Sequence, residues 1–210
     1  MKAIIQELIT EKGKELAAIG IAILLVAAGA LAVHFYTQGG DSFVPEEVSV
    51  TKAKISKALS RGINAMEDVT NNLNELLRLE KAGNSSEIIQ KLPADKADLA
   101  KIGEALLSMP QDIQLVADKI SQVRPRNAGK PLSEAMGAAA QTSIELLRLR
   151  EDMVALYDGL EALARGGKTE EYGSIVDKVN RQGSLINSLY REFQANMATF
   201  KDITKEYKDE

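Results

Sequence analysis

The feature that most constrains this chain is an uncharged apolar run of eighteen residues, Leu16 to Val33, near its start. As a helix rising about 1.5 Å per residue it extends roughly 27 Å, close to the thickness of the hydrocarbon layer of a membrane. Three rings able to lie among lipid headgroups, His34, Phe35 and Tyr36, follow at once. We therefore expect residues 16–36 to be a transmembrane anchor.

The charges around this run predict its orientation. Lys2, Lys12 and Lys14 precede it, whereas the next basic residue, Lys52, comes only after three carboxylates. Because positive charge is retained on the cytoplasmic side, the expected topology is a single pass in the cell membrane with the N-terminus in the cytoplasm. Residues 1–15 form an amphipathic segment on that side, residues 37–45 form a linker, and residues 46–210 lie outside.

Two other interpretations of the N-terminal segment remain open. A cleaved signal peptide could use the small residues Ala30 and Ala32, although the apolar run is longer than is usual for such peptides. A prepilin-like segment could be cut after Gly13, but Ala18 stands where the pilin pattern places Glu. The first alternative would leave no anchor, and the second would make the chain a pilin-like filament or surface-assembly subunit.

The rest of the chain predicts an all-α fold with four helical stretches, because aromatic residues are scarce and apolar residues recur every three or four positions. The stretches run from about 46 to 82, 86 to 123, 131 to 165 and 169 to 208. The second is expected to be kinked or broken at Pro93 and Pro110, since proline removes a backbone donor. Short connections favour an antiparallel up-down-up-down four-helix bundle.

Heptad spacing predicts which side chains are buried in three of these stretches. The first has Ile55, Leu59, Gly62, Met66, Val69, Leu73 and Leu76. The third has Leu132, Ala135, Ala139, Thr142, Leu146, Leu149, Met153, Leu156, Leu160 and Leu163. In the fourth, the residues that recur every seven positions are Tyr172, Val179, Ile186, Phe193, Phe200 and Tyr207, with Ile175, Leu189 and Ile203 at the intermediate positions. The polar Gln182 and Asn196 fall on the same ridge, where they could fix helix register or touch a small ligand.

No catalytic, cofactor-binding or metal-binding site is predicted, and we expect a protein that is not an enzyme. The single histidine, His34, excludes histidine clusters, and the lack of cysteine excludes thiolate ligands. Residues 162–169 loosely match a phosphate-binding loop but follow a helix rather than a strand, so a helix end explains them better. A net charge of -4 with both signs interspersed argues against a nucleic-acid partner.

One loop is a candidate contact with the membrane surface. In the expected topology the basic residues Arg124, Arg126 and Lys130 return toward the bilayer, near His34, Phe35 and Tyr36, although an ordinary solvated turn explains them too. The expected partners are membrane lipid and either another protein or a second copy of the chain. The predicted function is protein–protein interaction or scaffolding at the outer face of the membrane. The alternative is a ligand-binding sensor domain with a cleft near residues 135–142 and Gly183.

Overall fold

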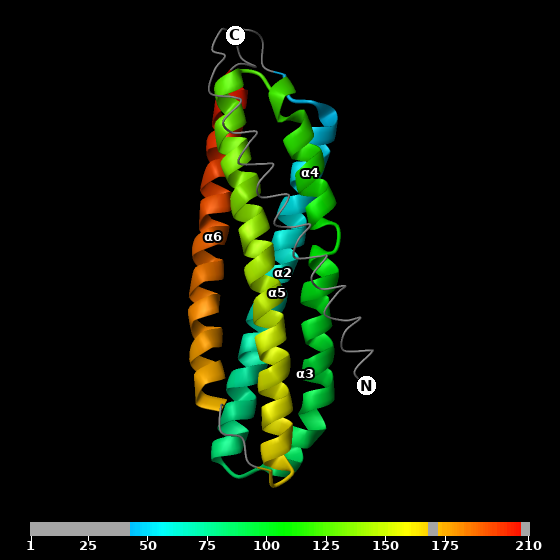
Figure 1. Ribbon diagram of the computed structural model, residues 1–210, viewed down its shortest axis with the longest axis vertical. Coiled ribbons are helices and arrows are strands. Elements are labelled where there is room, and N and C mark those ends of the chain that lie inside the picture. Colours follow the sequence, from blue (N-terminus) through cyan, green and yellow to red (C-terminus); the bar gives the residue numbers. More distant parts are fainter. Residues whose placement is uncertain (1–42, 168–171, 207–210) are drawn as a thin grey trace, which may run out of the picture. The chain divides into compact units, whose positions relative to one another are not determined.

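The computed structural model describes residues 43–167 and 172–206, and within these ranges the protein is all-helical (Figure 1). The predicted anchor, residues 16–36, lies outside them. The α-helices are α2 (Glu46–Lys81), α3 (Ser85–Leu106), α4 (Met109–Lys119), α5 (Gly129–Ala164) and α6 (Tyr172–Glu206). Two short 3-10 turns, η1 (Ile120–Gln122) and η2 (Arg126–Ala128), connect α4 to α5. No helix in the described ranges is both long and apolar enough to cross a membrane.

The prolines of the second stretch behave differently from each other. The helix breaks between Leu106 and Met109, and Pro110 then occupies the first turn of α4, where a missing backbone N–H costs nothing. Pro93 instead lies inside α3, which continues through it. Because Pro93 is exposed, water can solvate the carbonyl group that loses its helical partner. The break expected at Pro110 is therefore confirmed, whereas no break occurs at Pro93.

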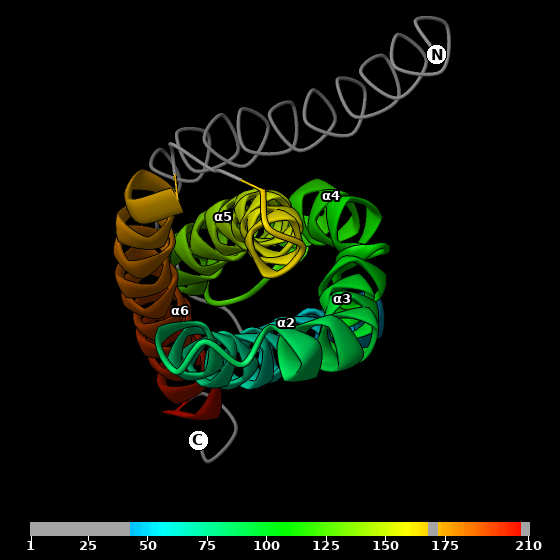
Figure 2. The same ribbon diagram turned by 90° about the horizontal axis from the view of Figure 1, so that it is seen from below.

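The described residues form two compact helical units, each containing segments of four long stretches. Unit 1 contains residues 43–56, 108–144 and 189–206; unit 2 contains residues 57–107, 145–167 and 172–188. In unit 2, α2 turns into α3 through Ala82–Asn84, where Gly83 has a φ of 72° that favours glycine. The two helices joined by this turn run in opposite directions (Figure 1) and lie side by side where Figure 2 shows them from below.

Each unit has its own apolar core. In unit 1, Val48, Ile55, Ile113, Val116, Leu132, Phe193 and Phe200 are buried. In unit 2, the buried residues include Leu59, Val69, Leu76, Leu99, Ile102, Leu149, Leu156 and Ile186. All seven predicted positions of α2 are buried, as are all those of α5 except the half-buried Leu163. The heptad ridges are thus largely covered by the chain itself.

Polar bonds connect the helices of unit 2 around this core. Lys96 of α3 pairs with Asp158 and Glu161 of α5, each at 2.7 Å. Lys91 and Glu75 pair at 2.8 Å between α3 and α2. These groups are partly exposed, so the pairs favour one arrangement of the helices more than they add to stability.

Candidate functional site

A loop at one end of unit 1 carries the three basic residues that the sequence predicts as a membrane contact. Its central feature is an isolated antiparallel bridge: the Phe43 amide donates to the Arg124 carbonyl at 3.1 Å, and the Arg124 amide donates to the Phe43 carbonyl at 2.8 Å. The bridge joins the chain just before α2 to the loop between α4 and α5. The Phe43 side chain is 55% exposed.

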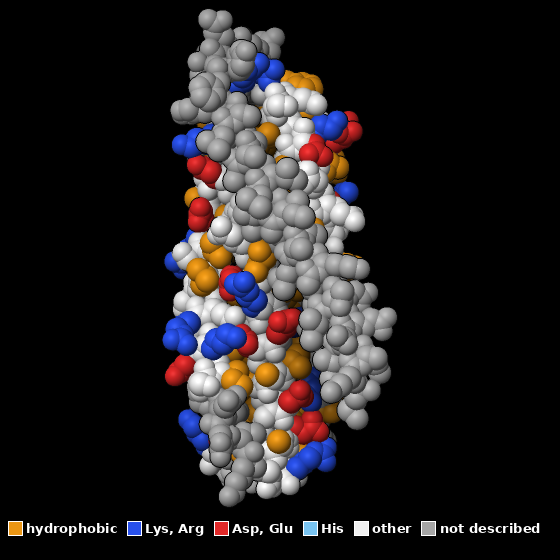
Figure 3. All heavy atoms as spheres, viewed as in Figure 1, with side chains coloured by type: hydrophobic (Ala, Val, Ile, Leu, Met, Phe, Trp, Pro, Cys, Tyr) orange, Lys and Arg blue, Asp and Glu red, His pale blue; other side chains and the backbone are white. Residues whose placement is uncertain are grey.

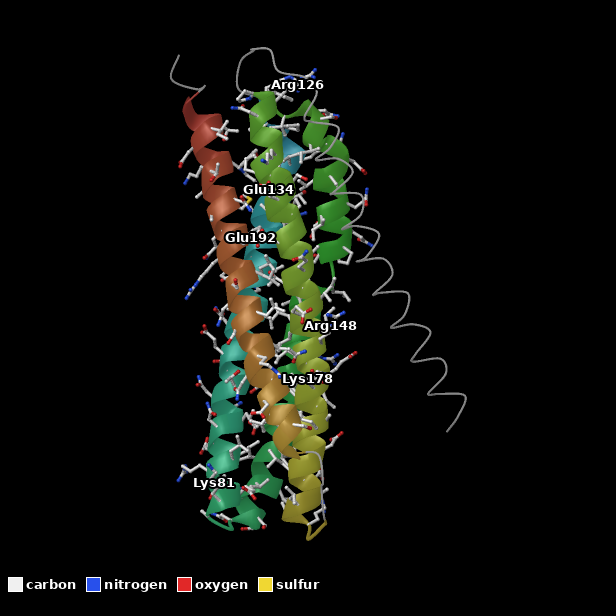
Figure 4. The ribbon with its side chains drawn as sticks, turned by 60° about the vertical axis from the view of Figure 1, so that its left-hand side comes forward. Lys81, Arg126, Glu134, Arg148, Lys178 and Glu192 are labelled. Carbon is white, nitrogen blue, oxygen red and sulfur yellow. The ribbon has the colours of Figure 1, made fainter. Side chains whose placement is uncertain are left out.

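The cations lie on consecutive short elements of this loop. The Arg124 guanidinium donates at 2.9 Å to two carbonyl groups, those of Ser121 and Val123. Arg126 is the first residue of η2. In Figure 4 it lies above Glu134, near the start of α5. Lys130 follows in the first turn of α5 and is exposed. We call Phe43, Arg124, Arg126 and Lys130 the basic surface.

Two carboxylates on the helices next to the basic surface form ion pairs with lysines. Glu47 pairs with Lys119 at 3.2 Å, and Glu134 lies 3.9 Å from Lys130, at the limit of an ion pair. The segment 124–130, which runs from the loop into the first turn of α5, contains three cations and no carboxylate. Glu47 and Glu134 lie on the flanking helices α2 and α5.

Three of the six predicted contact residues, Arg124, Arg126 and Lys130, lie in one described segment that runs from the loop before η2 into the first turn of α5. His34, Phe35 and Tyr36 are outside the described residues. Phe43, which the sequence analysis did not single out, belongs with the three cations. The pairing could not be read from the sequence, because nothing local to Phe43 specifies a partner in a loop so far along the chain.

A second candidate is a groove in unit 2 of about 410 Å³ between α2 and α6, with α5 beneath it. Its apolar residues are Met66, Leu149 and Val179; its polar residues are Glu67, Thr70, Asn71, Asn180, Ser184 and Asn187. Gly183 also lines it, and a Cβ atom there would meet no other atom within 4 Å. The absence of a side chain at Gly183 therefore leaves room in the groove.

The groove agrees only in part with the cleft expected from the sequence. Gly183 lines it, but Ala135, Ala139 and Thr142 belong to unit 1 and are fully buried. The Thr142 hydroxyl donates to the Ala138 carbonyl at 2.7 Å, so it is already satisfied within α5. Residues 135–142 therefore contribute to the packing of unit 1 rather than to the groove.

The two polar residues on the ridge of α6 have different surroundings. Gln182 is buried, and its Oε1 has no hydrogen-bond partner in the described part of the chain. Asn196 is half-buried. Neither residue lines the groove. Gln182 is therefore a buried polar group on a packing face, consistent with an effect on helix register.

The phosphate-loop-like residues form a helix end as far as the structure describes them. The Gly166 amide donates to the Leu163 carbonyl at 2.9 Å, the Gly167 amide donates to the Ala162 carbonyl at 2.8 Å, and Gly166 has a φ of 85°. These bonds satisfy the last carbonyl groups of α5. Lys168 and Thr169 are outside the described residues.

Charged side chains of both signs and hydrophobic side chains are interspersed on the face that Figure 3 presents. Among residues 43–167 and 172–206, no three His, Asp or Glu side chains gather in a way that could hold a metal ion.

No protein-family model, curated protein or solved structure matches the chain. The candidate sites therefore stand on their own geometry.

Proposed function

We propose that the protein is a membrane-anchored, non-enzymatic helical bundle that acts in protein–protein interaction or scaffolding at the outer face of the membrane. In this proposal residues 16–36 cross the bilayer, residues 1–15 are cytoplasmic and residues 46–210 are extracytoplasmic. The four helical stretches follow one another in up-down-up-down order. The anchor keeps the bundle beside the membrane, and the bundle docks another protein or a second copy.

The observation that carries this proposal is the bridge between Phe43 and Arg124. Phe43 comes only a short stretch after Tyr36, and even fully extended that stretch covers at most about 25 Å. An anchor that ends at Tyr36 would therefore leave the membrane close to the end of unit 1 that carries the bridge. This favours an arrangement in which the basic surface faces the bilayer.

A docking role is supported by apolar side chains that the cores leave exposed. Leu107, at the break between α3 and α4, is 79% exposed, and Val154 and Leu185 of unit 2 are also exposed. A single exposed leucine is common on protein surfaces. Leu107, however, lies at a helix break and is exposed enough to enter a pocket on a partner. Leu107 is therefore the position of choice for detecting a partner.

The experiment is photo-crosslinking of the full chain in intact membranes, with the reactive group at position 107 and, as a control, at the exposed Lys81. The proposal predicts an adduct of one defined mass from position 107, with a partner protein or with a second copy, and none from position 81. Position 81 is the last residue of α2, and its neighbours in sequence, Glu80 and Ala82, are not large hydrophobic residues. Equal background labelling from both positions would contradict docking at Leu107.

The second candidate function is ligand binding at the groove in unit 2, which the open space at Gly183 favours. A Gly183→Met side chain would take up space at the groove, and its Cβ would meet no neighbouring atom within 4 Å. Gly137 of α5 provides a matched control, because a Cβ there also meets nothing within 4 Å and the residue does not line the groove.

The test is a thermal-shift screen of small metabolites against the unmodified chain and both variants. Ligand binding predicts that a stabilising compound raises the melting temperature of the unmodified chain and of Gly137→Met, but not that of Gly183→Met. If no metabolite stabilises the unmodified chain, or if Gly183→Met responds equally, the groove is not a ligand site.

A further inference from the structure

We infer that the basic surface rests on the bilayer itself, with the Phe43 ring at the interface and the cations on anionic lipid headgroups. This inference depends on the proposed membrane anchor and adds the chemistry of the contact. It distinguishes a bundle that lies against the membrane from one that hangs freely on a linker.

The first argument is the association of an exposed aromatic ring with a basic loop. Phe43 is 55% exposed, and its backbone is hydrogen-bonded in both directions to Arg124. The backbone of Phe43 is therefore fixed next to that of Arg124, in the segment that carries the three cations. Aromatic rings favour the membrane interface, where an apolar body can enter the acyl boundary next to charged headgroups.

The second argument is the distribution of charge. Residues 124–130 contain three cations and no carboxylate, although the whole chain has a net charge of -4. Arg124 makes its hydrogen bonds to backbone carbonyl groups, which are neutral and do not cancel its charge. A segment with three cations and no carboxylate, on a chain that is acidic as a whole, is complementary to a surface of anionic headgroups.

The third argument is the short length of chain between this surface and the apolar run. Phe43 is ten residues beyond Val33, the last residue of that run. Even when fully extended, this stretch reaches only about 35 Å. A bundle on so short a connection is confined near the headgroups, so a modest attraction is enough to keep it in contact.

Tryptophan fluorescence gives a direct test, because the chain contains no Trp. The full-length Phe43→Trp variant is reconstituted into vesicles of phosphatidylcholine, with or without phosphatidylglycerol, whose acyl chains carry bromine as a quencher. Leu107→Trp is the control, since Leu107 is exposed but is separated from η1 by the eleven residues of α4. Flotation of the vesicles reports separately whether the chain is anchored.

The inference predicts that the emission of Phe43→Trp shifts to shorter wavelength and is quenched in vesicles that contain phosphatidylglycerol, while that of Leu107→Trp does not change. Adding Arg126→Gln and Lys130→Gln to Phe43→Trp should reduce the quenching to the level seen in phosphatidylcholine alone. Removing two exposed cations elsewhere, by Arg78→Gln and Lys81→Gln, should leave the quenching unchanged. If the variant with both loop cations removed melts early, Phe43→Trp with Lys130→Gln alone replaces it, with a partial loss expected.

Three results would overturn the inference, and they are distinguishable. If the vesicles carry the protein but Phe43→Trp is no more quenched than Leu107→Trp, the anchor stands and the surface contact fails. If Phe43→Trp is quenched equally with and without phosphatidylglycerol, the ring inserts and the recognition of anionic headgroups fails. If the protein does not float with the vesicles, the proposed anchor and the contact fail together.

Discussion

The Tyr157 hydroxyl of α5 donates a hydrogen bond of 3.2 Å to the Val69 carbonyl of α2, and the tyrosine is fully buried. The ring fills the core of unit 2, while the hydroxyl finds a partner on the neighbouring helix. A buried hydroxyl without such a partner would be costly, so the bond helps to specify how α2 and α5 pack.

Removing this hydroxyl tests the bond directly. Tyr157→Phe keeps the ring and should lower the free energy of unfolding by about 1 kcal/mol, measured by urea denaturation. The control is Tyr190→Phe, since Tyr190 is only half-buried and no hydrogen bond of its hydroxyl occurs among the described residues. Equal stabilities for the two variants would mean that the Tyr157 bond contributes nothing.

Alkaline pH gives a second readout of the same residue. Burial, assisted by the charges of Asp95 and Asp98, raises the pKa of Tyr157 well above its ordinary value of 10.0. The unfolded chain loses this proton near its ordinary pKa while the folded chain retains it. The stabilisation is therefore complete below pH 10.0 and is lost as the pH rises above that value. Tyr157→Phe should make the decline in stability above this pH shallower, and an unchanged slope would contradict the assignment.

Gly62 marks a close approach of helices in unit 2. A Cβ atom on it would lie 3.1 Å from Leu146 Cδ1 and 3.5 Å from Leu106 Cδ2. Gly62→Leu should overpack this contact and lower the free energy of unfolding by roughly 1–3 kcal/mol. Gly137→Ala, in open space on α5, should instead raise it by up to about 1 kcal/mol through helix propensity. Chemical denaturation of both variants checks the opposite signs, and a stabilised Gly62→Leu would refute the close packing.

Gln182 provides a prediction of increased stability. Its buried Oε1 has no partner in the described part of the chain, and such a group carries a desolvation cost. Gln182→Met has a similar length and should raise the free energy of unfolding by about 1 kcal/mol. If the residue fixes helix register, amide hydrogen exchange in α6 should at the same time become less protected. A loss of stability would mean that Gln182 Oε1 does accept a hydrogen bond in solution.

Much of the fold could be predicted because packing follows a local repeat. The seven apolar positions of α2 recur with heptad spacing and are all buried, and Pro110 falls in the first turn of a helix, where proline is favoured. Heptad ridges are predicted for three stretches but not for the second, which contains Pro93 and Pro110. Ile88, Leu92, Leu99, Ile102 and Leu106 nevertheless maintain one buried face through Pro93.

The candidate sites could be predicted only where they are local in sequence. The basic loop is visible as Arg124, Arg126 and Lys130, but its association with Phe43 depends on a pairing between distant segments. Tyr157 adjoins a predicted core position, Leu156, and nothing in the heptad spacing indicates that its hydroxyl reaches α2. The groove is lined by residues of three helices, α2, α5 and α6, and Gly183 is the one residue of the expected cleft that lines it.

The central claim is that residues 16–36 hold the protein in the membrane. The most direct measurement is alkaline carbonate extraction of membranes from cells that make the full chain, followed by intact-mass analysis of the protein. We predict that the protein stays in the membrane pellet with residues 16–36 still attached. A protein that is released by carbonate, with this segment removed, would contradict the account.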